Sequence, residues 1–352
     1  MTLREIETPA VLLDLDAMER NTERLRRIVQ GSSMRLFPHY KSHKCVDIAR
    51  WQLENGAEGI TCAKLSEAED LVKAGIPRIV LANQVVQPSK LRRLAALAGE
   101  AEIAVCADSA EPVLTLAEAC RQAGTQVGVL IELEVGMRRC GLDSFEAVRD
   151  LARLILTQPA LRFEGIQAYA GQLSHETDAA KRRAGMQTAE ARAAALKAYL
   201  ERDCGIPVKE ICGGSTGTAA DKPKSTVYTQ LQAGSYLFMD TSYGKLDLGF
   251  EQAMFVLATV ISRSADRAVL DCGVKSLPMD QDPPCLRDDP GRPLILHEEH
   301  TIVEGADLAP GQPVLLVPGH CCTTNNSFDR VCLTRNGIVQ RVIPVTSRAK
   351  AQ

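Results

Sequence analysis

The stretch RLFPHYKSHKC, residues 35–45, places two lysines, two histidines and a cysteine directly after a short apolar run. That run, at 34–38, ends at a proline and predicts a buried strand, and Lys41 follows it closely. A lysine at the mouth of an apolar barrel loses part of its hydration, which favours the neutral amine that forms a Schiff base with an aldehyde cofactor. An ordinary basic surface loop has the same residues, so the stretch alone leaves both interpretations open.

The first 240 residues alternate between short β-branched runs and amphipathic stretches that end near glycine or asparagine. Helical patterns occupy most of the gaps, for example 46–55 and 65–74, whereas the gap between 212 and 229 is too short for a full helix. Eight strands with helical crossovers predict an α/β fold, a parallel (β/α)8 barrel of the TIM type. The predicted strands are 34–38, 59–64, 78–83, 103–107, 127–133, 163–168, 208–212 and 229–233.

After about residue 250 the helical period disappears and the pattern becomes that of strands. Asn336-Gly337 is typical of a β-hairpin turn, and residues 280–293 predict a polar, proline-rich loop. A β-domain is therefore expected after the barrel, and the early strand at 9–15 is assigned to it. The strands expected in this domain lie within 253–264, 267–274, 293–305, 312–319 and 330–345. The predicted domains are the barrel at 16–245 and the β-domain at 1–15 and 246–352.

The composition is that of a globular protein, with 45% hydrophobic and 24% charged residues in a chain of 352. A formal net charge of -3 argues against a surface for nucleic acid or for acidic membranes. The N-terminus lacks the apolar core of a signal peptide, and no apolar run approaches the roughly 18 residues of a membrane span. Twelve cysteines without a C-x-x-C pair indicate reduced thiols, so we expect a cytoplasmic protein.

A candidate phosphate site follows the seventh predicted strand, in CGGSTGTA at 212–219. Its glycines allow close backbone approach and its hydroxyls add donors, a combination that binds phosphate. The stretch QAGSYLFMD, at 232–240 after the eighth strand, is a candidate to complete this site. A flexible glycine-rich turn is the alternative. The candidate ligands are Gly214, Ser215, Thr216, Gly217, Thr218, Gly234, Ser235 and Tyr236.

Two further polar stretches follow predicted strands, where the functional groups of a parallel barrel collect. In EVGMRRCG, at 134–141, Arg139 is a candidate donor to a phenolic oxygen of the cofactor or to a substrate carboxylate. In QAYAGQLSH, at 167–175, Tyr169 and His175 are candidates to reach the site. A turn with solvent-facing arginines and a buried, hydrogen-bonded tyrosine are the ordinary alternatives, and the residues alone do not separate them.

A candidate metal pair lies in VPGHCCTTNN, at 317–326. His320 and Cys322 are two residues apart, so both side chains point the same way if the segment is extended. Imidazole and thiolate are good ligands for zinc. Two ligands are too few for a closed structural site, which indicates an open, catalytic one. A pair of reduced cysteines in a loop is the alternative.

Taken together and in this order, these stretches resemble the fold-type III pyridoxal-phosphate enzymes. The resemblance runs from TPAVLLDLDAMERN through FPHYKSHKCVDIARWQ, GITCAKLSEAEDLVKAGI, VGMRRCG, GGSTGT and QAGSYLFMD to VPGHCC. It is specific for the metal-dependent group that holds D-threonine aldolases, 3-hydroxy-D-aspartate aldolases and dehydratases, and D-serine dehydratases. It implies a barrel like the N-terminal domain of alanine racemase, binding pyridoxal 5'-phosphate, and a C-terminal β-domain.

The resemblance also implies roles for the candidate residues. Lys41 occupies the position of the lysine that forms the Schiff base, and Lys44 is the next candidate. His320 and Cys322 hold a divalent metal, with zinc preferred over Mn, Mg or Co, and the metal binds the β-hydroxyl of the substrate. In the aldolases of the family this pair is usually His-x-Asp, and in the D-serine dehydratases it is His-x-Cys.

Two reactions of a β-hydroxy-D-amino acid follow from this resemblance. If Lys41 removes the Cα proton and hydroxide leaves, the products are a 2-oxo acid and ammonia. If a base removes the β-hydroxyl proton instead, the Cα–Cβ bond breaks and gives glycine and an aldehyde. Cys322 favours dehydration, although the surrounding sequence is more like that of the aldolases.

The resemblance further implies a homodimer, in which the β-domain of one subunit completes the barrel mouth of the other. D-serine, D-threonine and D-threo-3-hydroxyaspartate all suit the chemistry, and Arg138 is a candidate cation for a second carboxylate. Amino-acid racemases of this fold need no metal pair. Non-catalytic pyridoxal-phosphate carriers have the barrel but no β-domain. Both alternatives are therefore disfavoured.

Overall fold

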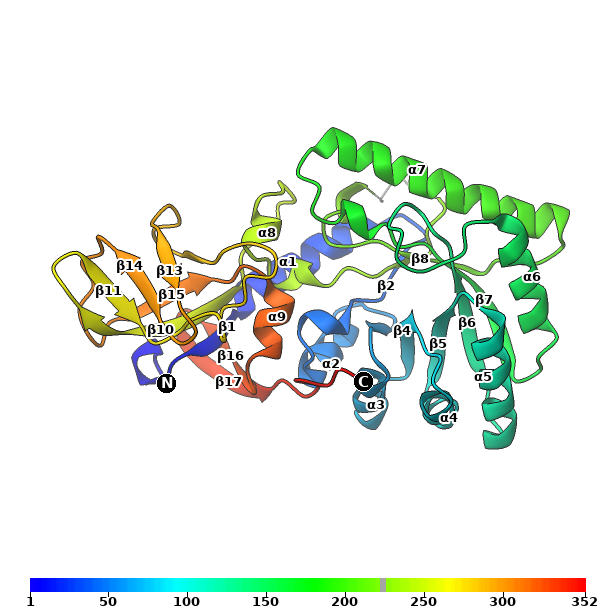
Figure 1. The fold of residues 1–352 in the computed structure, drawn as a ribbon, viewed down its shortest axis with the longest axis horizontal. Coiled ribbons are helices and arrows are strands. Elements are labelled where there is room, and N and C mark those ends of the chain that lie inside the picture. Colours follow the sequence, from blue (N-terminus) through cyan, green and yellow to red (C-terminus); the bar gives the residue numbers. More distant parts are fainter. Residues whose placement is uncertain (222–225) are drawn as a thin grey trace. The chain divides into compact units, whose positions relative to one another are not determined.

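The computed structural model describes residues 1–221 and 226–352, which form two compact units (Figure 1). The barrel unit consists of Arg26–Lys41, Ile48–Gly234 and Lys350–Gln352, and the β unit consists of Met1–Leu25, Ser42–Asp47 and Ser235–Ala349. The domain limits predicted from the sequence, at 15/16 and 245/246, remain predictions.

The barrel unit contains an eight-stranded parallel sheet, which confirms the predicted α/β barrel, and each predicted strand matches an observed one within two residues at either end. Two backbone hydrogen bonds of 2.9 Å close the ring. The Glu58 amide donates to the Leu36 carbonyl, and the Thr61 amide donates to the Pro38 carbonyl. In spatial order the strands are β2 (Arg35–Leu36), β9 (Gln230–Leu231), β8 (Glu210–Gly213), β7 (Leu161–Gln167), β6 (Val127–Glu132), β5 (Glu102–Ala107), β4 (Arg78–Gln84) and β3 (Ile60–Cys62).

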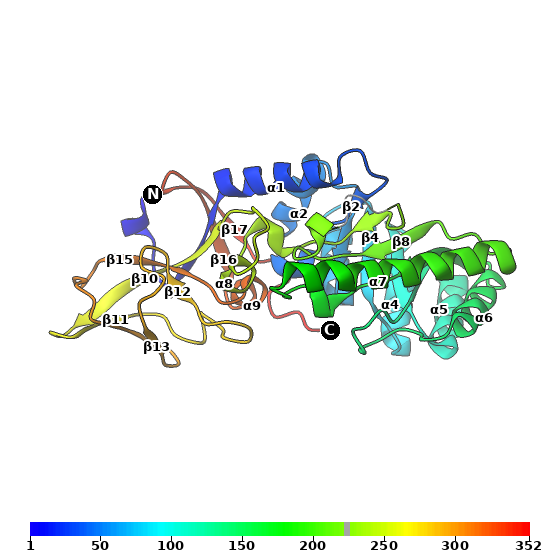
Figure 2. The same ribbon diagram turned by 90° about the horizontal axis from the view of Figure 1, so that it is seen from above.

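Helices connect the strands and lie along the outside of the sheet (Figures 1 and 2). Helix α6 shows why these segments are amphipathic, since it buries Val148, Ala152 and Ile155 at helical spacing. The predicted helices at 46–55 and 65–74 are confirmed by α2 and α3. The helices are α2 (Val46–Glu54), α3 (Leu65–Lys73), α4 (Pro88–Leu97), α5 (Ala110–Ala123), α6 (Phe145–Leu156) and α7 (Ala179–Ala198), the last continued by a π-helical turn (Tyr199–Asp203).

The interior of the barrel is packed by one large ring and several small side chains. Phe37 is fully buried in a cluster with residues of β4, β5, β6 and β8, namely Val80, Cys106, Leu130 and Cys212. A Cβ at Gly59 would lie 2.4 Å from the Phe37 ring, so glycine is required at that position. The interior is therefore a core and not a channel.

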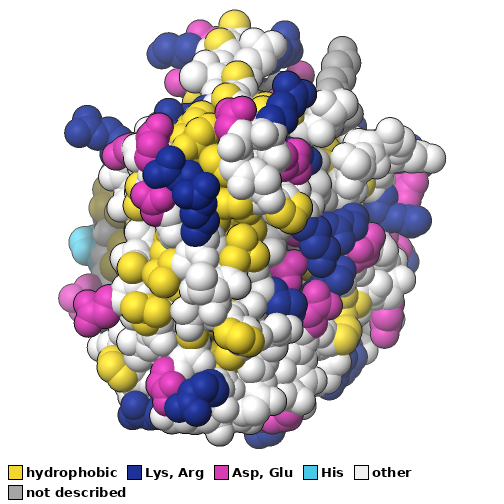
Figure 3. Space-filling view, turned by 90° about the vertical axis from the view of Figure 1, so that its right-hand side faces the viewer, with side chains coloured by type: hydrophobic (Ala, Val, Ile, Leu, Met, Phe, Trp, Pro, Cys, Tyr) yellow, Lys and Arg dark blue, Asp and Glu magenta, His cyan; other side chains and the backbone are white. Residues whose placement is uncertain are grey.

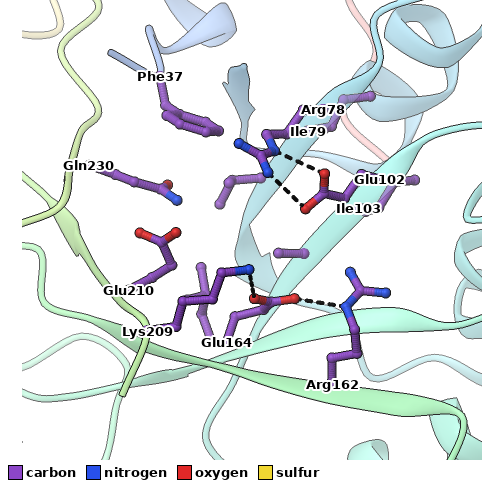
Figure 4. A pocket seen from close by; sticks show the side chains of 13 residues that line it. Phe37, Arg78, Ile79, Glu102, Ile103, Arg162, Glu164, Lys209, Glu210 and Gln230 are labelled. Carbon is purple, nitrogen blue, oxygen red and sulfur yellow. Dashed lines mark hydrogen bonds and ion pairs between the residues drawn. The ribbon is translucent and has the colours of Figure 1, made fainter. Parts of the chain in front are cut away.

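Ion pairs line the N-terminal end of the barrel, around a small cavity (Figure 4). Arg78 pairs with Glu102 at 3.0 Å. Glu164 accepts hydrogen bonds from Arg162 at 2.9 Å and from Lys209 at 3.2 Å. Because acids and bases alternate here, their charges neutralise one another. The face of the molecule in Figure 3 likewise carries acidic and basic side chains side by side.

The β unit is built on a nine-stranded sheet. Strand β1 (Ala10–Asp14) is antiparallel to β10 (Met254–Arg263) and parallel to β16 (Arg330–Arg335), so the predicted strand at 9–15 joins the C-terminal strands, as expected. Asn336 and Gly337 have positive φ values of 52° and 71°, which confirms the predicted hairpin turn. Helices α1 (Leu15–Val29), α8 (Thr241–Gly244) and α9 (Cys321–Asn326) accompany this sheet in the sequence.

Residues 280–293 are not a loop throughout, because they include a short strand, β12 (Cys285–Leu286), which pairs with β15 (Pro313–Val317). This corrects the prediction of a loop over the whole stretch. The path through the sheet is β13 (Leu294–Leu296), β14 (Thr301–Glu304), β11 (Arg267–Leu270), β10 (Met254–Arg263), β1 (Ala10–Asp14), β16 (Arg330–Arg335) and β17 (Ile338–Pro344). Beside β10 lies β15 (Pro313–Val317), which also pairs with β12 (Cys285–Leu286).

All twelve cysteines lie in the described part of the chain and are free thiols, in keeping with the prediction of reduced cysteines. Most are buried, and the partly exposed ones are Cys140, Cys204, Cys285 and Cys322. Cys322 is therefore one of the few thiols that solvent reaches. Among the described helices, none has the length and apolar character needed to cross a membrane.

We expect Glu210→Gln to lower the free energy of unfolding by about 1–3 kcal/mol, because buried Glu210 accepts charge-assisted hydrogen bonds from Arg35 and a further bond from Thr229. Glu102→Gln is the control. Its pair with Arg78 is half exposed and contributes less than about 1 kcal/mol. Urea unfolding of both variants measures the difference, and equal losses would contradict the assignment of stability to the buried pair.

Candidate active site and metal pair

Lys41 lies on a 3-10 turn, Tyr40–Ser42, just beyond the end of β2. The chain before it is fixed by a bridge between His39 and Thr61, and the Lys41 amide donates to His39 Nδ1 at 3.4 Å. The Lys41 side chain is exposed, whereas the sequence analysis expected it to be shielded at the barrel mouth. That expectation is wrong for this structure, because the turn carries Lys41 beyond the paired residues of β2.

The stretch after β8 packs so closely on the chain after β7 that glycine is required at two positions. A Cβ at Gly213 would lie 2.6 Å from the Ala168 carbonyl oxygen, and one at Gly217 would lie 1.9 Å from the Ser174 carbonyl oxygen. The glycines were predicted to allow close backbone approach. At Gly213 and Gly217, the group that comes close is another part of the protein's own backbone. The predicted lack of a full helix before 229 falls partly on 222–225, outside the described residues.

Three buried hydroxyl side chains, Ser215, Thr216 and Thr218, follow β8. Thr218 Oγ1 accepts a hydrogen bond from the Ser215 amide at 3.0 Å, and Ser215 Oγ accepts one from the Thr218 amide at 3.3 Å. The two hydroxyls also lie 3.2 Å from each other. Each hydroxyl offers one donor and two acceptor positions, so Ser215 and Thr218 keep hydrogen-bonding capacity for a ligand. Such a close-packed loop fits the phosphate of pyridoxal phosphate.

Arg139 lies among polar groups from the ends of β4, β6 and β7. Its guanidinium is 3.7 Å from the buried Glu132 carboxylate and 5.6 Å from the centre of the Tyr169 ring. Burial raises the pKa of Glu132, although the hydrogen bond from Gln84 and the charge of Arg139 oppose this. The Tyr169 hydroxyl lies 3.2 Å from Ser174 Oγ. The structure thus brings Arg139 and Tyr169 together.

The other candidates of the barrel site are placed differently. His175 is exposed, after the 3-10 turn that follows β7. Gly234 is the last residue of the segment Ile48–Gly234 of the barrel unit. Ser235 and Tyr236 are buried in a 3-10 helix of the β unit. Ser235 Oγ lies 4.0 Å from the Cys322 sulfur, so the structure places this hydroxyl beside the metal pair. Its assignment to the phosphate site remains a prediction.

The candidate metal pair lies at the start of helix α9. His320 is the N-cap residue, and Cys322 is in the first turn. The prediction of one extended segment is therefore wrong, because the His320 carbonyl accepts hydrogen bonds from Thr324 and a helix begins there. The two side chains nevertheless lie together. Burial alone would lower the pKa of His320, but contact with the Cys322 sulfur and the Asp280 carboxylate raises it to about 9.

Cys321, between the two candidate ligands, is buried. Its amide donates to Asp240 Oδ2 at 2.9 Å, and its sulfur lies 4.0 Å from that of Cys322. The Cys322 sulfur and burial hold the pKa of the Cys321 thiol well above its ordinary value, so Cys321 stays a thiol. Within residues 1–221 and 226–352, no group of three or more His, Cys, Asp or Glu side chains is arranged for a metal. A histidine and thiol pair with open positions fits a catalytic ion.

Three polar residues of these sites escaped the sequence analysis. Gln84 and Glu132 are the last residues of β4 and β6, so a signal was present, namely a polar residue that ends an apolar strand. Asp280 contacts His320 across 40 residues of sequence, which no local pattern indicates.

Comparison with known proteins accounts for most of the chain. The family model described as "Alanine racemase, N-terminal domain" matches residues 13–242, and the one described as "Putative serine dehydratase domain" matches residues 253–334. The chain belongs to the alanine racemase N-terminal domain family. It is thus a fold-type III pyridoxal-phosphate protein, as its motifs indicated.

Several similar proteins of this family are named aldolases or dehydratases. The chain is 40% identical to a D-threonine aldolase of Arthrobacter sp, over 98% of this chain and 94% of that one. The crystal structure of D-threonine aldolase from Filomicrobium marinum has a TM-score of 0.97 at 37% identity, covering 100% of this chain and 98% of that one. The structure of D-threo-3-hydroxyaspartate dehydratase from Delftia sp. HT23 has a TM-score of 0.86 at 28% identity, covering 97% of this chain and 98% of that one. The protein is therefore an enzyme, a lyase for which pyridoxal phosphate is the expected cofactor.

Two variants of a D-threo-3-hydroxyaspartate dehydratase bear on the metal pair. One, described as a metal-free form, has a cysteine replaced by alanine, with a TM-score of 0.84 at 27% identity over 98% of this chain and 99% of that one. The other has a histidine two residues earlier replaced by alanine, with a TM-score of 0.82 at 28% identity over 98% and 96%. The spacing is that of His320 and Cys322.

Replacing Gly217 with alanine should weaken the binding of pyridoxal phosphate by about tenfold or more, because the new Cβ must displace the Ser174 backbone. Overpacking of this kind costs about 1–3 kcal/mol. Equilibrium dialysis with absorbance detection measures the affinity. Gly291→Ala is the control, since the space around Gly291 is open. Equal affinities in the two variants would show that the loop has no part in cofactor binding.

Proposed function

We propose that the protein is a pyridoxal-phosphate- and metal-dependent lyase of β-hydroxy-D-amino acids, and that its main reaction is dehydration to a 2-oxo acid and ammonia. The named activities of its relatives support the substrate class. The choice of reaction rests on one observation, the pairing of His320 with a thiol, Cys322, where aldolases of the family usually have a carboxylate.

Lys41 is the residue that binds the cofactor covalently in this proposal. Its place after β2 and its match to the family lysine support this role. When bound, pyridoxal phosphate supplies a sink for the electron pair left at Cα. Once released from the cofactor, the Lys41 amine takes the Cα proton, and this proton and the departing hydroxide make up the water that is eliminated.

The loop at 214–218 binds the phosphate through its hydroxyls and amides in this proposal. Arg139 donates to the phenolic oxygen of the cofactor, and its ion pair with buried Glu132 orients the guanidinium. Tyr169, whose ring lies beside Arg139, helps to position the cofactor. His175, in the stretch after β7, is proposed to reach the site as well.

His320 and Cys322 hold the divalent metal. The thiolate favours zinc over the harder ions Mg and Mn, and cobalt takes the same ligands. A zinc ion held by this pair supplies a Lewis acid for the β-hydroxyl oxygen of the substrate. The Ser235 hydroxyl lies 4.0 Å from the Cys322 sulfur.

Retro-aldol cleavage to glycine and an aldehyde is the second candidate, and overall similarity favours it. Identity is 40% to the aldolase and 28% to the dehydratase. The pair His320 and Cys322 favours dehydration, since the residues replaced in the two dehydratase variants are likewise a histidine and, two positions later, a cysteine. We give more weight to the pair, because residues at the reacting bond determine chemistry, whereas overall identity mainly reports the fold.

D-serine, D-threonine and D-threo-3-hydroxyaspartate are the proposed substrates. Arg138, exposed after β6, is the candidate cation for the second carboxylate of hydroxyaspartate. We also propose that the protein is a homodimer and is cytoplasmic. The first proposal rests on the family resemblance, and the second rests on the free cysteines.

Borohydride treatment of the purified protein should attach the cofactor irreversibly to Lys41, as read by mass spectrometry of peptides. In Lys41→Ala the attachment should disappear, and turnover should fall by about a thousandfold or more, because covalent binding and proton transfer are both lost. Lys44→Ala, three residues along, is the control and should keep the attachment. Cofactor found on Lys44 in the wild-type protein would contradict the assignment.

Removal of zinc with a chelator should abolish turnover and leave the yellow cofactor in place, because the metal serves the β-carbon. Wild-type protein with D-serine should yield pyruvate and ammonia. Cys322→Asp should shift the products from D-threonine toward glycine and acetaldehyde, because it recreates the aldolase-type pair. Cys321→Ala is the control and should keep its metal, since Cys321 is a buried thiol.

Product analysis also decides between the two candidate functions. Formation of glycine and aldehyde by the wild-type protein, without any 2-oxo acid, would replace dehydration by retro-aldol cleavage. Full turnover after complete metal removal would remove the metal from the proposal altogether.

A further inference from the structure

The proline-rich loop that the sequence analysis predicted at 280–293 begins against the metal pair. Asp280 Oδ2 lies 2.7 Å from His320 Nδ1. The other oxygen of the same carboxylate accepts a hydrogen bond of 2.7 Å from Thr323 Oγ1. Both oxygens of Asp280 are thus engaged by residues at the start of α9, so the carboxylate is held in one orientation.

We propose that Asp280 positions His320 for metal binding, a role that rests on the proposed metal pair. A carboxylate at Nδ1 accepts the proton of the neutral imidazole, which fixes the tautomer and leaves the Nε2 lone pair for the metal. The negative charge also makes the imidazole a stronger donor. Asp280 acts through His320 and does not itself touch the metal.

The loop is anchored closely enough to fix this carboxylate. A Cβ at Gly319 would lie 1.8 Å from the Asp282 carbonyl oxygen, so the loop backbone rests directly on the residue before His320. Thr241 Oγ1 donates to the Pro283 carbonyl at 2.9 Å. The Asp282 carboxylate accepts hydrogen bonds from Ser242 and Lys245. Helix α8 and Gly319 therefore hold the loop at the second and third residues after Asp280.

The backbone of His320 is fixed independently of Asp280. The His320 carbonyl accepts hydrogen bonds from the Thr324 amide at 3.2 Å and from Thr324 Oγ1 at 2.8 Å. These bonds set the position of the Cα atom but not the rotation of the imidazole ring. The contact with Asp280 restricts that rotation, so loss of the carboxylate should affect the ring more than the fold.

The test is the zinc affinity of the full-length protein loaded with pyridoxal phosphate, measured by competition with a chromophoric chelator. Asp280→Asn should bind zinc about 10–100-fold more weakly than the wild type. The thermal unfolding midpoint of its metal-free form should stay unchanged. Asp288→Asn is the matched control, since the Asp288 carboxylate, further along the same segment, bonds the adjacent Arg287. Its zinc affinity should remain within about twofold of the wild-type value.

Equal zinc affinities of Asp280→Asn and the wild type would overturn the positioning role and leave the proposed metal pair intact. A wild-type protein that binds no zinc would overturn both. If Asp280→Asn fails to fold, Thr323→Val decides, because it removes one of the two bonds to the carboxylate. The same hydroxyl also bonds the His320 carbonyl at 3.3 Å, but that carbonyl keeps its two bonds from Thr324. Zinc binding about threefold weaker or more would support the role, and unchanged binding would overturn it.

Cobalt substitution separates positioning from direct ligation. At saturating cobalt, the visible absorption bands of Asp280→Asn should match those of the wild type, because the ligands stay the same and only the affinity falls. Altered bands at saturation would show that Asp280 is itself a ligand, and would overturn the positioning role.

Discussion

Closure of the barrel between β2 and β3 is the constraint on which the rest of the structure depends. Strand β2 is only two residues long, and hydrogen bonds from Glu58 and Thr61 hold the chain on either side of Phe37. Because all eight strands are parallel, closure gathers their carboxyl ends around one opening. Five of the candidate positions follow such ends, namely Lys41, Arg139, Tyr169, His175 and the loop at 214–218.

The two ends of the barrel use polar residues in opposite ways. At the N-terminal end, charges such as Arg78 and Glu102 are paired with one another, which stabilises the barrel and leaves little binding capacity. At the carboxyl end, Gly213 and Gly217 give up side chains so that two segments pack backbone to backbone. Conformational freedom of the unfolded chain makes such glycines costly, so their presence indicates a requirement of the site.

In the β unit, helix α9 is held by contacts from segments far apart in the sequence. Asp240 accepts the amides of Cys321 and Tyr243, which ties α9 to α8. Asn325 donates to the Ser42 carbonyl at 2.7 Å, and Asp280 bonds the first turn. The proposed metal site has only two protein ligands and depends on such support, because neither ligand is fixed by a complete coordination shell.

Local pattern was sufficient for the eight barrel strands, the β-domain and the hairpin at Asn336-Gly337, because periods of 2 and 3.6 and turn chemistry act between near neighbours in sequence. Motif order was sufficient for the family. The tertiary structure alone decided the exposure of Lys41, the start of α9 at Cys321, and the reach of Asp280 to His320. Burial, helix capping and long-range hydrogen bonds depend on which distant segments pack together, and no local period encodes that.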